Sequence, residues 1–353
     1  MGSRALRRAS LIELVEMAKP LLQQAEIACP RRGPGRRPTI PDWVLATLIM
    51  VAVLKRRKSK SGQYRFLEQH RDLLQRALGV KVFPARSTYF DRYRRAHHLF
   101  RTAVRLQGRR AIREGVADGH CVAADKSLAA ARGPVWHKKQ RQRGVAPRGV
   151  DREASWSYSE HHGWVYGYGF EVVVTAPKQG VVFPLLADVE TASVREMRTF
   201  LDKIPQLPGE TKKVLADSGY DTNDIGEAIE WTPAGKHTGC RFLCRQVKPR
   251  RTAKKQWHET RRRQQRRRRR LARRSYFETA AAKRLYRRRG KTVEPFHQWF
   301  KHLFHIDDRL WHRGLDNNRT QLLAAVLCYQ LLLRYNHRRQ LHHGQIQWVL
   351  DGL

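Results

Sequence analysis

Acidic residues are scarce in this sequence. Its 353 residues include 71 Lys and Arg but only 31 Asp and Glu, which gives a formal charge of +40. So large an excess goes beyond solubility tuning and points to a polyanionic partner. Nucleic acid is the first candidate, because each cation that neutralises a phosphate releases a condensed counterion. An acidic membrane surface is the weaker one. Hydrophobic residues still make up 41% of the chain, enough for a real core.

Long apolar runs and paired cysteines are lacking too. The longest apolar run, residues 43–54, stops at three basic residues; it is too short to span a bilayer and is typical of a buried helix. Five scattered cysteines, an odd number, argue against a disulfide framework. The N-terminal residues lack the apolar stretch of a secretory signal. We therefore expect a cytoplasmic protein without membrane contact.

Residues 1–115 have a helical and basic pattern. Pro41 favours the start of a helix at about its first position, and Gly79 favours the end of another helix over residues 64–78. A third helix is predicted over residues 89–101, with Ser87 as its N-cap.

The third predicted helix combines basic and aromatic side chains. It contains Arg92, Arg94 and Arg95 together with Tyr89 and Tyr93. A short helix, a turn and a basic-aromatic helix suit a helix-turn-helix-like DNA reader, with these arginines as DNA contacts. The alternative is a helical bundle whose charges are only solvated.

The middle of the chain changes to strand patterns. Apolar runs over residues 120–125 and 213–217 each end in an Asp, and residues 164–175 and 181–187 read as a hairpin. One more strand is predicted over residues 241–244. Strands followed by alternating strands and helices predict a mixed sheet with helices on its faces.

Residues 246–291 are the most basic stretch of the chain. Between Arg261 and Arg274, ten of fourteen residues are Arg. No sheet or core could hold that run, so an exposed helix or a disordered arm that lies along DNA phosphates is predicted. Its candidate contacts are Arg266, Arg267 and Arg268.

Three carboxylates form a candidate catalytic set. Asp125 and Asp217 stand where predicted strands end, and Glu294 falls in the first turn of a helix predicted to begin near Thr292. Lys301 lies two turns further along that helix. Phosphodiester chemistry with two Mg²⁺ ions needs hard oxygen ligands, so carboxylates from separate elements suit it.

These motifs resemble those of DDE transposases of bacterial insertion sequences. The specific pieces are Leu215-Ala216-Asp217-Ser218-Gly219-Tyr220-Asp221 and the set Tyr286, Arg289, Glu294 and Lys301; the first Asp lies in Ala124-Asp125-Lys126-Ser127. One departure stands out. Arg289 and Glu294 are one residue further apart than the family pattern usually has, so Arg288 or Lys291 is an alternative for the Arg role.

The resemblance implies an α/β fold with a ribonuclease-H-like mixed sheet flanked by helices and an N-terminal all-helical DNA-binding domain. The chain would divide into a helical DNA-binding domain (1–115), the first part of the catalytic core (116–245), an arginine-rich arm or insertion (246–291) and C-terminal helices that complete the core (292–353). Asp125, Asp217 and Glu294 would bind Mg²⁺, for which Mn²⁺ can substitute. Tyr286, Arg289 and Lys301 would contact DNA.

The function expected from the resemblance is metal-dependent cleavage of insertion-sequence ends followed by strand transfer. Double-stranded DNA would be the partner, a homodimer would form on it, and the setting would be the bacterial cytoplasm or nucleoid. Two alternatives stay open, namely an inactive transposase-derived DNA-binding protein and a structure-selective nuclease or RNase with the same core. A zinc site at His237, Cys240 and Cys244 is disfavoured by its spacing.

Overall fold

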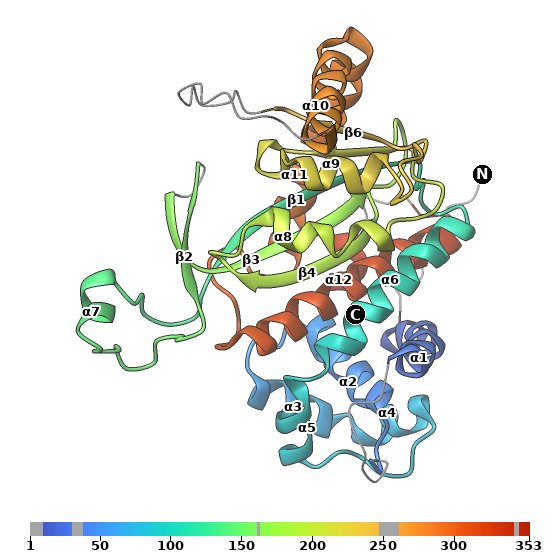
Figure 1. Ribbon diagram of the computed structural model, residues 1–353. Coiled ribbons are helices and arrows are strands. Elements are labelled where there is room, and N and C mark those ends of the chain that lie inside the picture. The colour runs from blue at the N-terminus through green and yellow to red at the C-terminus, as the bar shows by residue number, and fades with distance from the viewer. Residues whose placement is uncertain (1–9, 30–37, 161–162, 247–260, 342–345) are drawn as a thin grey trace.

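The protein is described here by a computed structural model, which covers residues 10–29, 38–160, 163–246, 261–341 and 346–353. A helical segment comes first, followed by a sheet with helices on its faces and by two long helices near the C-terminus (Figure 1). The helices before the sheet are α1 (Leu11–Ala28), α2 (Asp42–Leu54), α3 (Lys60–Gln69), α4 (Arg71–Leu78), α5 (Arg86–Tyr93) and α6 (His97–Arg113).

The first segment confirms two of the helix boundaries predicted from the sequence and corrects the others. Pro41 is the N-cap of α2, and Gly79 ends α4 in the left-handed conformation, with φ at 70°. The predicted single helix over residues 64–78 is divided at His70 into α3 and α4. The helix predicted over residues 89–101 is likewise divided, because α5 stops at Tyr93 and α6 starts at His97.

The sheet is mixed and has six strands. It has the order β2-β3-β1-β5-β6, with β4 paired to β3; β3 is antiparallel to β1, β2 and β4, while β5 is parallel to both β1 and β6. The strands are β1 (Cys121–Ala130), β2 (Ser155–Ser159), β3 (Gly163–Thr175), β4 (Pro184–Thr191), β5 (Lys213–Ala216) and β6 (Arg241–Cys244). The predicted hairpin corresponds to β3 and β4, and the predicted strand over residues 241–244 to β6.

Helices complete the two faces of the sheet. Short helical elements lie in the connections between strands, and three long helices follow β6. The connecting elements are α7 (Lys138–Gln142), α8 (Glu196–Leu201), η1 (Ile204–Gln206), η2 (Ser218–Tyr220) and α9 (Asn223–Glu230). The helices after β6 are α10 (Arg261–Glu278), α11 (Ala280–Leu303), α12 (Leu315–Arg338) and the short α13 (Ile346–Asp351).

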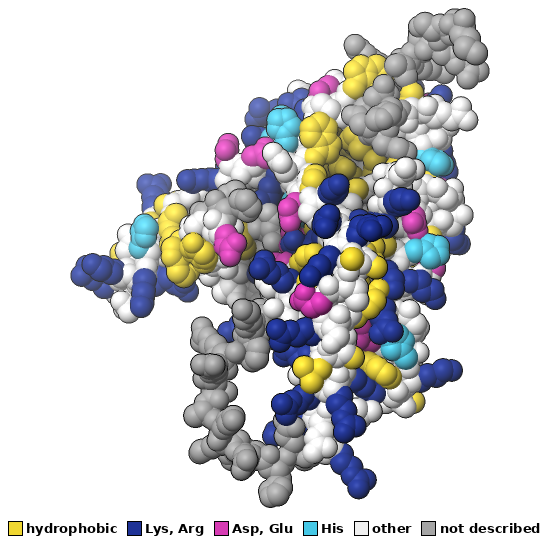
Figure 2. Space-filling view, turned by 90° about the horizontal axis from the view of Figure 1, so that it is seen from above, with side chains coloured by type: hydrophobic (Ala, Val, Ile, Leu, Met, Phe, Trp, Pro, Cys, Tyr) yellow, Lys and Arg dark blue, Asp and Glu magenta, His cyan; other side chains and the backbone are white. Residues whose placement is uncertain are grey.

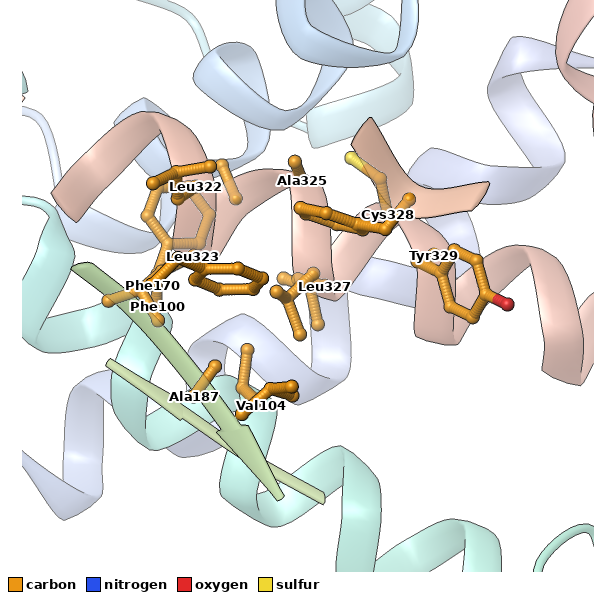
Figure 3. Close-up of a cluster of buried hydrophobic side chains, with 14 of the residues drawn as sticks. Phe100, Val104, Phe170, Ala187, Leu322, Leu323, Ala325, Leu327, Cys328 and Tyr329 are labelled. Atoms are coloured by element: carbon orange, nitrogen blue, oxygen red, sulfur yellow. The ribbon is translucent and has the colours of Figure 1, made fainter. Parts of the chain in front are cut away.

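Helix α12 lies at the centre of the hydrophobic core. It packs against α2 and against both α6 and β4, which also contact each other, so it lies between the helical segment and the sheet (Figure 1). Figure 3 shows its side chains in one cluster with residues of α6, β3 and β4. Because α12 is buried on nearly all sides, its sequence is apolar around almost the whole circumference.

Helix α10 agrees with one of the two alternatives predicted for the basic run, and helix α11 corrects a prediction. The most basic run forms α10, a regular helix from Arg261, while residues 247–260 lie outside the described residues. The helix predicted to begin near Thr292 instead begins at Ala280 with Thr279 as its N-cap, and Pro295 lies inside it. Pro295 has no backbone N–H, so one helical hydrogen bond is missing at that turn.

The described residues include no helix that is both long enough and apolar enough to cross a membrane.

Candidate active site

Asp125 and Asp217 are brought together by neighbouring parallel strands. Ala124 of β1 and Ala216 of β5 are register partners, so the aspartates that follow them lie side by side. Asp217 leaves β5 directly and caps η2, where its Oδ1 accepts a hydrogen bond from the Gly219 amide at 2.8 Å. Asp125 is different from the prediction, because β1 continues to Ala130 and places Asp125 inside the strand.

Glu294 reaches the same place from a helix. Helix α11 packs against β1, β3, β5 and β6, and Glu294 lies past its midpoint. Thr292 therefore does not cap a helix start. Its hydroxyl donates to the Arg288 carbonyl one turn earlier, at 2.8 Å.

A single guanidinium joins the three carboxylates. Arg289 donates one hydrogen bond to Asp125 and another to Glu294, both at 2.8 Å and from different nitrogens. The nitrogen that bonds Asp125 is also 3.8 Å from an oxygen of Asp217. The Arg289 side chain is 13% exposed, so these interactions form largely out of solvent. The carboxylates thus surround one positive charge.

The pKa of Asp125 reflects both its burial and the charges around it. Burial raises the pKa of the Asp125 carboxyl to about 6; Arg289 opposes the rise, and the negative charges of Asp217 and Glu294 add to it. Without a cation beside it, a desolvated carboxylate among other carboxylates would take up a proton. Arg289 provides the positive charge in this structure.

Lys301 and His297 complete the wall of the site on α11. The Lys301 ammonium donates to the Leu128 carbonyl of β1 at 2.8 Å, and burial lowers its pKa. The His297 ring is buried, and its Nε2 lies 3.8 Å from Asp125. His297 shares a helix face with Glu294. Its contact with Asp125 makes it part of the site.

A fourth carboxylate adjoins the aspartates. Glu196, at the start of α8, lies so close to Gly219 that a Cβ there would be 2.2 Å from its Oε2. Burial raises the pKa of Glu196 to about 7, and the charge of Asp217 adds to the rise. No motif marks Glu196 in the sequence, since only the fold brings α8 to this edge of the sheet.

Tyr286 and the predicted arginines of α10 lie in different surroundings. The Tyr286 ring is half-buried and makes an edge-on contact with Phe277, with centroids 5.0 Å apart. Arg266 pairs with Asp224 of α9 at 3.3 Å, whereas Arg267 and Arg268 are exposed.

One face of α10 is tied to α9 by charge pairs. Arg269 and Arg273 contact Glu227, and Arg269 also lies over the Trp231 ring at 3.7 Å. Since these arginines follow helical spacing, α10 has one anchored face and one solvent-facing basic face.

The predicted arginines of the first segment also separate into two kinds. Arg92 bonds the Ile40 carbonyl at 2.7 Å and pairs with Asp42, so it holds two helices together. Arg94 and Arg95 are exposed. Tyr89 and Tyr93 of the same helix, by contrast, are fully buried, so these two rings belong to the core.

The carboxylates suit a hard divalent cation by their chemistry, since they offer only oxygen ligands. As the side chains stand, however, the described residues contain no group of three His, Cys, Asp or Glu placed to hold a metal ion. The guanidinium of Arg289 lies between the oxygens instead. Metal binding would therefore require Arg289 to move.

The family model of the transposase DDE domain matches residues 109–331, well over half of the chain. The chain belongs to the DDE transposase family. The match spans β1 to β6, α10, α11 and most of α12, and so includes all three carboxylates. Neither the curated proteins nor the solved structures gave a match.

Other carboxylates of the transposase sheet form ion pairs with arginines outside the candidate site. Asp188 and Glu190, which lie within β4, pair with Arg101 and Arg319 at 2.6 and 2.5 Å. Cys244, part of the disfavoured zinc pattern, is buried with its thiol 2.8 Å from the Asp217 carbonyl.

Proposed function

We propose that the chain is a transposase that binds insertion-sequence ends, cleaves them in a metal-dependent reaction and joins them to target DNA. The observation that carries the proposal is the convergence of three carboxylates from separate elements on the Arg289 guanidinium. They are Asp125, Asp217 and Glu294. A +40 chain of the DDE transposase family supplies the matching charge for the substrate.

A ribonuclease-H-like core is part of this proposal. It is supported by antiparallel β1, β3 and β4 followed by β5 and β6 in parallel, with helices on both faces. We extend it to the division of the chain into a DNA-binding segment (1–115), a catalytic core (116–245 with 292–353) and an arginine-rich arm (246–291).

In the mechanism, Asp125, Asp217 and Glu294 would hold Mg²⁺ or Mn²⁺. When bound there, such ions supply the Lewis-acid charge that activates an attacking oxygen and stabilises the leaving one. Arg289 would exchange its carboxylate partners for a DNA phosphate, which offers the same two-oxygen geometry to a guanidinium. Lys301 would hold a second phosphate oxygen, and the buried His297 ring, 3.8 Å from Asp125, would limit the space into which that carboxylate can turn.

DNA would be gripped at two further surfaces. The exposed Arg94 and Arg95 would contact it from the helical segment, and Arg267 and Arg268 from the solvent-facing side of α10. Joining two ends requires two active sites, so we expect a dimer on DNA. Phosphate contacts of this kind set position and affinity rather than sequence choice.

The test is cleavage of a duplex that carries the DNA flanking this gene, with Mg²⁺ or Mn²⁺. We expect cuts at a defined end by the wild type and none by Asp217→Asn, which should still bind. Asp188→Asn is the matched control, because this carboxylate lies on the same sheet but pairs with Arg101. Cleavage by Asp217→Asn would refute the assignment, and cleavage of an RNA–DNA hybrid instead would favour a nuclease.

One observation favours a second candidate, an inactive DNA-binding protein descended from a transposase. Arg289 already satisfies Asp125 and Glu294, as a permanent replacement for a metal would. In that case the wild type would bind the duplex in either metal without cutting it.

A further inference from the structure

Strands β2 and β3 form a two-stranded ribbon whose aromatic residues line up on one face. Tyr158 pairs with Trp164 in the register, and Trp156 pairs with Tyr166 two residues further in. Alternate residues of a strand point to the same side, so the two pairs stack along the ribbon. Their ring centroids are 5.7 and 5.5 Å apart.

The inner and outer pairs have opposite environments. Tyr166 is 4% exposed, and the Trp156 indole N–H donates to the Trp136 carbonyl at 3.0 Å, so the segment around α7 covers this pair. The outer pair is uncovered: Tyr158 is 60% and Trp164 is 69% exposed. The exposure of Trp164 leaves its ring open to a ligand.

Basic side chains lie near the covered inner end of the aromatic face, where His137 of the same segment contacts Trp156. Lys138, Lys139, Arg141 and Arg143 of the α7 segment are exposed, and Arg141 lies over the Trp136 ring at 5.4 Å. The ribbon and α7 stand out from the body of the molecule in Figure 1, and Figure 2 shows this lobe with hydrophobic side chains flanked by Lys and Arg. Aromatic rings beside cations are how proteins bind single-stranded nucleic acid, by stacking on bases and neutralising phosphates.

We propose that Trp164 and Tyr158 form a base-stacking surface for unpaired bases of DNA, with the cations of the α7 segment holding the phosphates beside them. The occupant is nucleic acid rather than a second copy of the chain, because a second copy would bring the same positive charge to this lobe. The inference deepens the proposed transposase function and concerns which DNA structure the enzyme grips.

The position of the surface defines which bases it meets. Asp125 is paired with Val172 on β3, eight residues along the strand from Trp164. At about 3.3 Å per residue, the two points are separated by up to about 26 Å. This distance corresponds to about seven or eight base pairs of duplex, at about 3.4 Å each. The stacked bases therefore lie well away from the bond that is cut.

The direct test compares dye-labelled single strands with blunt duplexes of the same sequence, neither carrying an element end, by fluorescence anisotropy. We expect Trp164→Ala to weaken binding of the single strand about tenfold or more, Trp164→Phe to retain most of it, and duplex binding to change little. Trp348→Ala is the matched control, since Trp348 is 39% exposed on α13, far along the chain.

Salt dependence separates stacking from charge. Trp164→Ala should leave the slope of log affinity against log salt unchanged, whereas Lys138→Ala should make it shallower by about one. Thermal unfolding of each variant shows whether the ribbon only loses a stabilising cross-strand pair, in which case Trp164→Ala would lower stability and bind normally.

The outcomes are distinct from those of the cleavage test. An inactive transposase relative would fail to cut DNA and still show Trp164-dependent binding of single strands. Equal binding by wild type and Trp164→Ala, with cleavage intact, would overturn the inference alone. So would a wild-type dimer in solution that Trp164→Ala disrupts without a change in DNA affinity.

Discussion

Removal of Arg289 should make the protein less stable and more responsive to metal. The side chain is 13% exposed and donates to Asp125, which is 14% exposed, and to Glu294, which is 55% exposed. The bond to exposed Glu294 contributes little, between about 0 and 1 kcal/mol. The bond to buried Asp125 contributes about 2 kcal/mol, as charge-assisted bonds do. Because Asp125 can take up a proton after the change, we expect a net loss of about 2 kcal/mol in Arg289→Ala, which is several degrees in Tm.

Divalent metal should reverse that loss. An ion that binds only the folded state raises its stability in proportion to the logarithm of its concentration over Kd. In the wild type the ion must first displace the guanidinium, so millimolar Mg²⁺ should raise Tm less than in Arg289→Ala.

The matched control for this experiment is Arg319→Ala. Arg319 is 18% exposed and also joins two carboxylates, Glu190 and Asp316, away from the site. It should lose similar stability and gain nothing from Mg²⁺. Calorimetric melting with and without Mg²⁺, at one pH, gives the Mg²⁺-dependent change in Tm for the wild type, Arg289→Ala and Arg319→Ala. An equal Mg²⁺ effect in wild type and Arg289→Ala would refute the reasoning that the guanidinium and the metal compete.

Three further predictions concern Gly219, the two faces of α10 and the buried His312. Gly219→Ala should reduce cleavage much more than stability, because the new Cβ would lie 2.2 Å from a movable Glu196 oxygen and 3.0 Å from Asp217; Glu196→Ala in the same chain should restore part of the rate in a cleavage assay. Arg268→Ala should weaken DNA binding and its salt dependence without changing Tm, whereas Arg269→Ala, which breaks a pair with Glu227, should lower the free energy of unfolding by about 1–3 kcal/mol; anisotropy and melting together show which face of α10 meets DNA. Burial lowers the pKa of His312 to about 3, so the unfolded chain binds this proton at higher pH than the folded one, and stability should fall as pH drops below about 6.5 by about 1.4 kcal/mol per unit for this group; urea unfolding at several pH values should show a flatter profile for His312→Gln, and an unchanged profile would contradict the assignment.

The sheet and its carboxylates could be predicted from the sequence to a large extent. Apolar runs that end in Asp125 and Asp217 mark β1 and β5, and parallel pairing of those strands then places both aspartates together. The extension of β1 past Asp125 could not be seen, since residues 126–130 are neither strongly apolar nor alternating. They are held in the strand by pairing with β3, which is a long-range contact.

The arginines were harder to interpret, because charge alone does not tell a DNA contact from a structural pair. Arg92 and Arg266 find acidic partners on other helices, while Arg268 in the same run as Arg266 does not face α9. The sequence predicted Glu294 in the first turn of a helix, whereas it lies past the midpoint of α11, since Thr292 and Pro295 together imitate a helix start. The tertiary packing of α11 carries the helix through Pro295 despite the missing bond.

Helix α12 connects the helical segment rigidly to the sheet. Its Gln330 amide bonds both the Val104 carbonyl of α6 and the Pro184 carbonyl of β4, and its Thr320 hydroxyl bonds the Tyr93 carbonyl at the end of α5. The segment that we propose reads DNA and the sheet that bears the carboxylates are therefore fixed to one rod. The protein would then fix the number of base pairs between a recognised sequence and the cut. Base pairs inserted between them should move the position of the cut, because no hinge in the protein would compensate for the added length.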